Sequence, residues 1–405
     1  MSDGLLQPCY ADSFRCTGSE CEESCCQAWG VYVDKATYKK YRATPGLRQA
    51  TGEHIELNHD TPTNFRYARI KFGEANRCPF LAEDKLCSIQ KQYGAEFLSK
   101  TCARYPRALV RFEGRMQKAL YLSCPEACRL VLSSPQLLPA PDRLRYHRFR
   151  PAAQQAAATT VSSAELLRDF ALDLLQDPSY PFWQRLFLLS IICRRVHELN
   201  AADQVALLLG QYATILQEGN LRASLDAIPA RPGLQLDLVL QLIQRRFQIE
   251  QPHHAFAVSV ADFLVVIGHS QERPAAEWAG RYHQAYVRCY ERFSQANPHF
   301  MENYALNYLF RTRFPYADAP GQMQRTIDPL TSSLLLVLHY RLLHSLLIGA
   351  AARYGDTFSS AHAVRVVHAF GRTIEHHVKF MDALLEFARS PDLQQSDGLA
   401  VLLKN

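Results

Sequence analysis

Cysteine is the residue type in this sequence with the clearest potential for chemistry. Near the amino terminus the chain reads CTGSECEESCC, a C-x4-C-x3-C-C pattern that contains Cys16, Cys21, Cys25 and Cys26. Three later segments, RCPFLAEDKLC, KTCARYPR and SCPEAC, help to place ten of the twelve cysteines between Cys9 and Cys128. Thiolates at such spacings can converge on one metal centre when the turns between them are tight.

The alternatives to a metal centre are disulfides and buried free thiols. The opening segment, MSDGLLQPCYADSF, has no basic stretch followed by an apolar run, so we expect no secretory signal and a cytoplasmic location. Clustered thiols in a reducing compartment are more often metal ligands than disulfides. We expect small, buried free thiols only at Cys9, Cys193 and Cys289. The absence of a C-x2-C pair, and more cysteines than the four that one zinc needs, are unusual for a structural zinc site. A [4Fe-4S] cluster takes four thiolates from scattered positions, but spacing alone does not decide, so both metals stay open.

The elements that must position these cysteines are expected to be short. Residues 1–133 are rich in turn signals and predict a small, irregular α+β domain that is cysteine-rich and binds the metal. Within it, ALVRFEGRMQKALYL predicts a hairpin that turns at Glu113–Gly114. Asp34 is expected to cap a helix over KATYKKYR, and Pro125 to lie in the first turn of another helix. Residues 134–162 hold four prolines and predict a basic linker.

An α-helical bundle is expected over residues 163–405, which makes the predicted fold mainly α. Segments such as SAELLRDFALDLLQD repeat apolar residues at three- and four-residue spacing, and about ten helices without strands are expected. The most apolar stretch, Leu334 to Ala352, is interrupted by His339, Tyr340, Arg341 and His344. That pattern predicts a buried amphipathic helix rather than a membrane span.

Four segments together resemble the flagellin lysine-N-methylase family of bacteria. They are CTGSECEESCCQAWGVYVD, RCPFLAEDKLCSIQKQYGAEFLSKTCARYPR, ALYLSCPEACRL and FMENYALNYLFRTRFPY. The first three also resemble the YkgJ-like group of zinc- or iron-chelating cysteine domains. The resemblance implies an enzyme that transfers methyl groups from S-adenosylmethionine to lysine side chains of flagellin, with a [4Fe-4S] cluster in the cysteine domain. A flagellar export chaperone is a further candidate partner.

The resemblance also implies a set of metal ligands. The candidates are Cys21, Cys25, Cys26, Cys78, Cys87 and Cys102, with Cys16, Cys124 and Cys128 in reserve. Two familiar ways of holding S-adenosylmethionine are missing from the sequence. The C-x3-C-x2-C pattern of radical enzymes is matched only at Cys21 and Cys25, since Ala28 takes the third position. No G-x-G-x-x-G loop follows a strand.

A lysine substrate demands a base or a lowered amine pKa, because the unperturbed pKa of lysine is about 10.4. The segment FMENYALNYLFRTRFPY supplies suitable groups at helical spacing. In the competing interpretation its tyrosines pack in the core, its polar residues cap or solvate the bundle, and the arginines of KTCARYPR are solvated. The candidates are Glu302 and Tyr304 as catalytic residues, and Asn303, Asn307, Arg104 and Tyr105 as cofactor-binding residues.

The histidines and the net charge bear on two further possibilities, a histidine metal site and a nucleic-acid partner. No cysteine or carboxylate pattern completes a metal site around the later histidines, so we expect helix-surface positions for His362, His368, His376 and His377. The net charge of +6 permits an acidic partner, but no nucleic-acid-binding signature accompanies it, and we expect no nucleic acid. A non-catalytic zinc- or iron-chelating binding protein is the alternative to the methyltransferase, and a redox protein is a third hypothesis.

Overall fold

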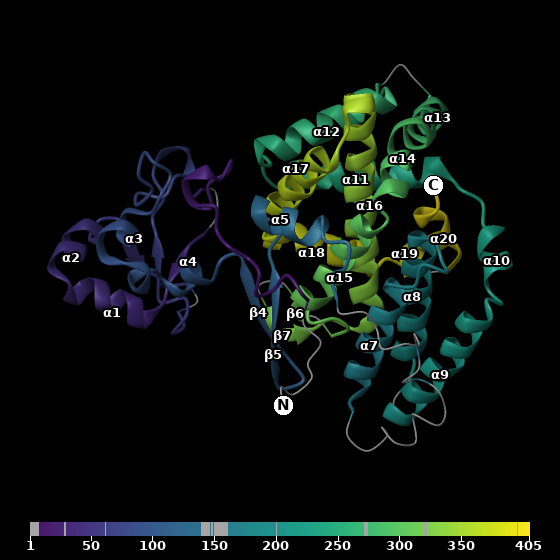
Figure 1. Ribbon diagram of the computed structural model, residues 1–405, viewed down its shortest axis with the longest axis horizontal. Coiled ribbons are helices and arrows are strands. Elements are labelled where there is room, and N and C mark those ends of the chain that lie inside the picture. Colours follow the sequence, from purple (N-terminus) through teal and green to yellow (C-terminus); the bar gives the residue numbers. More distant parts are fainter. Residues whose placement is uncertain are drawn as a thin grey trace. The chain divides into compact units, whose positions relative to one another are not determined.

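The structure is a computed structural model that describes residues 8–27, 30–60, 62–138, 146, 149, 161–199, 201–270, 274–316, 318–319, 322–394 and 396–405. The chain divides into two compact units (Figure 1). Unit 1 comprises Met1–Ser13, Leu109–Ser123 and Cys128–Asn405, and unit 2 comprises Phe14–Ala108 and Cys124–Ala127. The fold is mainly α, which confirms the predicted class. The boundaries expected at residues 133 and 162 stay a prediction, and most of the expected linker lies outside the described residues.

Unit 2 combines a small antiparallel sheet with short helices. The strands run in the order β1–β3–β2, and Ala68 of the central strand pairs with Val33 on one side and Leu57 on the other. Asp34 caps the first helix as predicted, since its carboxylate accepts a hydrogen bond from the Thr37 backbone N–H at 3.1 Å. The elements are β1 (Tyr32–Val33), α1 (Lys35–Ala43), α2 (Pro45–Thr51), β2 (Ile55–Leu57), β3 (Ala68–Ile70), α3 (Ser88–Tyr93) and α4 (Lys100–Arg104), with 3-10 turns at Gly18–Glu20, Glu74–Asn76 and Ala95–Phe97.

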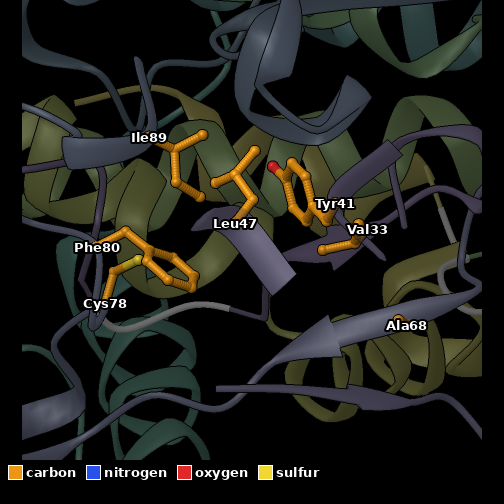
Figure 2. Packing of buried hydrophobic residues seen from close by; sticks show 7 residues of the cluster. All are labelled: Val33, Tyr41, Leu47, Ala68, Cys78, Phe80 and Ile89. Atoms are coloured by element: carbon orange, nitrogen blue, oxygen red, sulfur yellow. The ribbon is translucent and has the colours of Figure 1, made fainter. Parts of the chain in front are cut away.

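A small hydrophobic cluster holds unit 2 together, and one of its members is a cysteine. Figure 2 shows Cys78 beside Phe80 in this cluster. Cys26 and Cys87 are partly buried and pack against it. A unit of this size buries little apolar surface, so a metal held by these cysteines would add to the stability of unit 2. The buried members are Val33, Tyr41, Leu47, Ala68, Cys78, Phe80 and Ile89.

The predicted hairpin and the helix after it are both confirmed. Strands β4 (Arg107–Phe112) and β5 (Arg115–Leu120) pair with each other. Glu113 and Gly114, the two residues between them, have φ angles of 46° and 78°. A two-residue hairpin turn requires this left-handed conformation, which glycine adopts without strain. Helix α5 (Pro125–Leu132) begins at the predicted proline.

Unit 1 is built from packed helices, together with most of the β4–β5 hairpin and a second short hairpin. Its described part contains more helices than the ten or so expected, and the hairpin β6 (Asp318–Ala319) and β7 (Gln322–Thr326) was not expected. Two π-helical segments, η5 (Tyr286–Tyr290) and η7 (Gly371–Glu375), continue α13 and α17. The helices are α7 (Ser163–Leu175), α8 (Phe182–His197), α9 (Ala202–Glu218), α10 (Arg222–Asp226), α11 (Pro232–Ile249), α12 (His254–Ile267), α13 (Ala275–Ala285), α14 (Glu291–Ala296), α15 (His299–Thr312), α16 (Pro329–Tyr354), α17 (Ser360–Phe370), α18 (Val378–Ala388), α19 (Pro391–Gln394) and α20 (Ser396–Leu403), with a 3-10 turn at Gly355–Thr357.

Helix α16 is the central helix of unit 1, and α8, α12, α17 and α18 pack around it (Figure 1). Its residues are buried from Pro329 to Ala351, so the expected amphipathic pattern is wrong for this helix. Neighbours on all sides leave no face for solvent, and the polar His339 and Arg341 are therefore buried too. By length and apolarity alone Pro329–Thr357 could cross a membrane, but its apolar window is fully buried inside the protein.

Gly349 of α16 packs directly against the backbone of α12, and an added methyl group is expected to be costly there. A Cβ at this position would lie 2.7 Å from the Cα atom of Phe263. We expect Gly349→Ala to lower the free energy of unfolding by about 1–3 kcal/mol, because the helices must move apart. Gly233→Ala in α11 is the matched control, since nothing lies within 4 Å of its Cβ. Urea unfolding of both variants checks the prediction, and equal stability of the two would contradict it.

Candidate functional site

Five cysteines from separate segments of unit 2 lie close together. Cys25 and Cys26 lie in a turn, and the Cys78 backbone N–H donates to the Cys26 carbonyl at 2.9 Å, which joins two distant segments. Cys87 directly precedes α3, and Cys102 lies on α4. We call these five residues the thiol cluster.

Cys26 lies at the centre of the thiol cluster. Its side chain is hydrogen-bonded to the thiols of Cys25 and Cys78. The side chains of Cys87 and Cys102 lie within electrostatic range of Cys25 and Cys78. Among the sequence candidates for metal ligands, the structure thus brings five together. The sixth, Cys21, lies within electrostatic range of the reserve candidate Cys124, which is buried and also lies within electrostatic range of Cys25.

Most thiols of this cluster hold their protons at neutral pH. Hydrogen bonds to Cys25 and Cys78, together with burial, raise the pKa of Cys26 well above its usual range. Burial raises the pKa of Cys87 and raises that of Cys102 to about 12. The hydrogen bond from Cys26 lowers the pKa of Cys78. A metal that binds here must displace protons, because thiolates are the ligands.

The thiol cluster fits a thiolate-bound metal in donor type and number. Sulfur ligands alone suit zinc or an iron–sulfur cluster, and five sulfurs exceed the four that either needs. In the described part of the chain, no three histidine, cysteine, aspartate or glutamate side chains stand in ready metal-binding geometry. Binding would therefore have to draw the sulfur atoms closer together.

Four of the remaining cysteines belong to unit 1: Cys9, Cys128, Cys193 and Cys289. Cys193 is buried, as predicted, but Cys9 is exposed and Cys289 only half-buried, so the prediction is wrong for Cys9 and only partly right for Cys289. Cys9 lies in a turn, and its backbone N–H donates a hydrogen bond to the Leu137 carbonyl. The thiol of Cys128 is buried in unit 1 and donates to the Leu122 carbonyl at 2.8 Å.

The polar candidates on α15 hold unit 1 together. Asn303 donates from Nδ2 to the carbonyls of Val131 and Ser134, at 2.9 and 2.7 Å. Asn307 donates to the Leu120 carbonyl at 2.9 Å and accepts from the Leu120 N–H at 3.3 Å and from the Tyr10 hydroxyl. These bonds join α15 to the segments around it. Their expected role in binding a cofactor stays a prediction.

The two residues interpreted as catalytic point to different partners. Glu302 pairs with Arg185 of α8 at 2.6 Å. Tyr304 is buried, and its hydroxyl lies 3.3 Å from Nδ1 of His339 on α16. The other two cofactor candidates belong to unit 2. Arg104 is exposed, with its guanidinium 5.9 Å from the Phe65 ring centroid, and Tyr105 is half-buried.

A second group of chemically active side chains lies inside unit 1, and sequence reasoning missed most of it. We call it the polar cluster. Arg311 of α15 forms an ion pair with Glu375 at 3.2 Å, and their side chains are only 9% and 1% exposed. The Arg311 guanidinium also lies 5.5 and 5.9 Å from the ring centroids of Tyr308 and Tyr121. The polar cluster comprises Tyr121, Tyr304, Tyr308, Arg311, His339 and Glu375.

Burial decides the protonation states in the polar cluster. It raises the pKa of Glu375, although Arg311 and a hydrogen bond from the Leu122 backbone lower it in part. It lowers the pKa of His339 to about 3, with a further contribution from Arg311, so this imidazole is neutral. Burial alone would lower the pKa of Arg311, but the Glu375 carboxylate and nearby tyrosines raise it overall.

One sequence signal could have located this cluster. Tyr304, Tyr308 and Arg311 are spaced i, i+4 and i+7, which places them on one face of α15. The histidines around it were partly misjudged. His368 is buried rather than on a surface, and its Nε2 lies 3.1 Å from the Ser123 carbonyl. His376 is exposed, and its Nε2 lies 2.8 Å from the Ser123 hydroxyl.

The chain is thus a mainly helical protein of two units. Unit 1 contains a buried ion pair, and unit 2 contains a group of thiols. Residues 168–402 match the FliB lysine N-methylase C-terminal domain, so the chain belongs to the FliB lysine N-methylase family. It is 25% identical over 389 residues to the lysine-N-methylases of Salmonella choleraesuis (strain SC-B67) and Salmonella typhimurium (strain LT2), which covers 92% of this chain and 92% of each relative.

A shorter relative matches one part of the chain more closely. The flagellar biosynthetic protein FliU of Salmonella muenchen is 33% identical over 145 residues, which is 36% of this chain and 86% of FliU. No solved structure matches the chain.

Proposed function

We propose that this chain is a protein lysine N-methyltransferase that takes methyl groups from S-adenosylmethionine and transfers them to lysine side chains of flagellin. The observation that carries the proposal is the family match over residues 168–402. The names of two relatives that align over 92% of the chain support lysine methylation. The name of the FliU relative supports a flagellar substrate. A flagellar export chaperone as a further partner and a cytoplasmic location stay predictions.

We further propose that the thiol cluster holds a [4Fe-4S] cluster, with zinc as the alternative. Four of its five cysteines would be the ligands, and the fifth would remain a neighbouring thiol. Such a cluster supplies electron transfer or a Lewis-acidic iron when it is bound. The protein contributes the small core around Cys78, which fixes one sulfur and keeps water from that side.

The test combines metal analysis with a methyl-transfer assay. Protein purified without oxygen is analysed for iron, acid-labile sulfide and zinc, and is then incubated with isotope-labelled S-adenosylmethionine and flagellin. Label on flagellin lysines, located by peptide mass spectrometry, is the expected result. Flagellin with acetylated lysines is the control and should take up no label. Bound metal without any methyl transfer would instead indicate a non-catalytic metal-binding protein.

A further inference from the structure

Three buried polar atoms of the polar cluster have no hydrogen-bond partner among the residues that the structure describes. They are Arg311 Nε, His339 Nε2 and Glu375 Oε2. Buried polar atoms are nearly always paired, and exceptions point to a ligand, an ordered water or a catalytic role. These three atoms come from three different elements, α15, α16 and η7. His339 and Glu375 both lie within electrostatic range of Arg311.

Glu375 differs from the carboxylate that the sequence suggested. Its Oε1 bonds Arg311, while Oε2 is buried and unpaired. Glu302 instead directs Oε2 at Arg185, at a distance of 2.6 Å. A buried carboxylate oxygen without a hydrogen-bond partner can accept a proton from a bound group. An oxygen in a close ion pair already accepts a hydrogen bond from the cation.

The surroundings of Glu375 suit the side chain of a lysine. Tyr121, Tyr304 and Tyr308 supply aromatic surface for its methylene groups, and aromatic faces also attract the sulfonium of a methyl donor. The edge of the cluster, unlike the ion pair itself, reaches the surface of the protein. Tyr121 is half-buried, and His376, the residue after Glu375, is exposed.

Arg311 gives the cluster a second property that a lysine substrate needs. A fixed positive charge disfavours a second cation beside it, and burial acts in the same direction, so both lower the pKa of an amine that enters. His339 is neutral and adds no charge. The titratable groups around Glu375 are thus one permanent cation, one neutral imidazole and three tyrosines, with His376 at the exposed end.

We propose that the polar cluster receives the ε-amine of a substrate lysine, and that Glu375 Oε2 removes a proton from it before methyl transfer. This inference rests on the proposed function. The lysine ammonium gives one proton to Glu375, which leaves a neutral amine and a carboxylic acid. The nitrogen lone pair then forms the N–C bond to the methyl group as the C–S bond of the sulfonium breaks. The sulfur keeps the electron pair of that bond and leaves as a neutral thioether, and Glu375 later returns its proton to solvent.

The test is the pH dependence of methyl transfer in Glu375→Gln. We expect the variant to be slower by about 10²–10⁴-fold at neutral pH, which is the usual contribution of a general base. The deficit should shrink as the pH rises, because the lysine then loses its proton without help. Affinity for S-adenosylmethionine, measured by calorimetry, should not change. A wild-type rate in Glu375→Gln at neutral pH would overturn the proposal.

Two further Glu→Gln variants, one a control and one the competing candidate for the base, are compared with Glu375→Gln. Glu386→Gln removes an exposed carboxylate on α18 and should leave the rate unchanged. Glu302→Gln tests the residue that the sequence suggested. Loss of the pH-dependent rate in Glu302→Gln, with no loss in Glu375→Gln, would assign the base to Glu302 and overturn the proposal.

The Gln variant leaves Arg311 buried without its partner, so its folding must be checked by thermal unfolding. If it is unfolded, the double variant Arg311→Met/Glu375→Gln removes both charges and is the one to assay. The same loss at neutral pH and partial recovery at high pH are expected. A wild-type rate in the folded double variant would again overturn the proposal.

A binding experiment separates this inference from the proposed activity. Wild-type protein should bind unmodified flagellin more tightly than flagellin with acetylated lysines, and Glu375→Gln should reduce that difference. If wild-type protein shows this difference but transfers no methyl group, the proposed function fails while the lysine site stands. If it does transfer methyl groups but Glu375→Gln changes neither rate nor binding, only the site fails.

Discussion

The double variant Cys26→Ser/Cys78→Ser is expected to contain no cubane cluster and to lose methyl transfer. Only three sulfurs of the thiol cluster would remain, Cys25, Cys87 and Cys102, and a [4Fe-4S] cluster takes four. Cys26 is the thiol that contacts two others, and Cys78 lies in the core of unit 2, so these two are the least replaceable. The measurements are iron and acid-labile sulfide per chain, the visible absorption spectrum and the rate of lysine methylation.

The matched control is Cys9→Ser/Cys289→Ser, which removes one exposed and one half-buried thiol of unit 1. It should keep about four irons and four sulfides per chain, together with its activity. Equal metal content in the two double variants would show that the thiol cluster is not the metal site. One zinc and no sulfide in the wild-type protein would make the thiol cluster a structural zinc site instead.

Arg311→Met is expected to lower the free energy of unfolding by about 3–5 kcal/mol near neutral pH, because it leaves a buried carboxylate without its partner. The side chains of the pair are 9% and 1% exposed, so solvent cannot take over the role of the guanidinium. Urea unfolding measures the loss. The double variant Arg311→Met/Glu375→Gln should recover most of it, since no buried charge is then left.

The deficit of Arg311→Met should also depend on pH. The guanidinium lowers the pKa of Glu375, so its removal raises the folded-state pKa further above that of the unfolded chain. The folded variant then binds the proton more tightly than the unfolded chain does. This contribution to stability is complete below the unfolded pKa of about 4.3 and is lost as the pH rises through the folded pKa. The deficit relative to wild type should therefore widen from about pH 5 to pH 8, and a deficit that is constant over this range would contradict the assignment.

Local features of the fold followed from the sequence because each depends on a few neighbouring residues. Glu113–Gly114 turns the β4–β5 hairpin, Asp34 caps α1, and Pro125 begins α5. Each involves residues at most three positions apart in the chain. The sequence also shows that ten cysteines lie in its first third, but the six candidate ligands among them came from the family resemblance.

The partners of the polar side chains could not be derived in this way. Glu302 was interpreted as a catalytic carboxylate, but Arg185, its partner, lies 117 positions away in the sequence. Helix α16 was expected to be buried and amphipathic; it is buried, but the packing of α8, α12, α17 and α18 around it leaves it no separate polar face. A hydrophobic pattern shows that a helix is buried, but it does not show how many neighbours the helix has.

The sequence by itself determined the mainly helical class, the hairpin, the cap at Asp34 and the concentration of cysteines in its first third. Only the tertiary structure decided which carboxylate is buried with an open oxygen. Glu375 lies in a π-helical segment just before two histidines that were expected to lie on a helix surface. Arg311 meets it from a helix more than sixty positions earlier in the chain. The reason is physical: the pKa and the free hydrogen-bonding capacity of a side chain depend on burial and on the charges packed against it, and long-range packing alone supplies both.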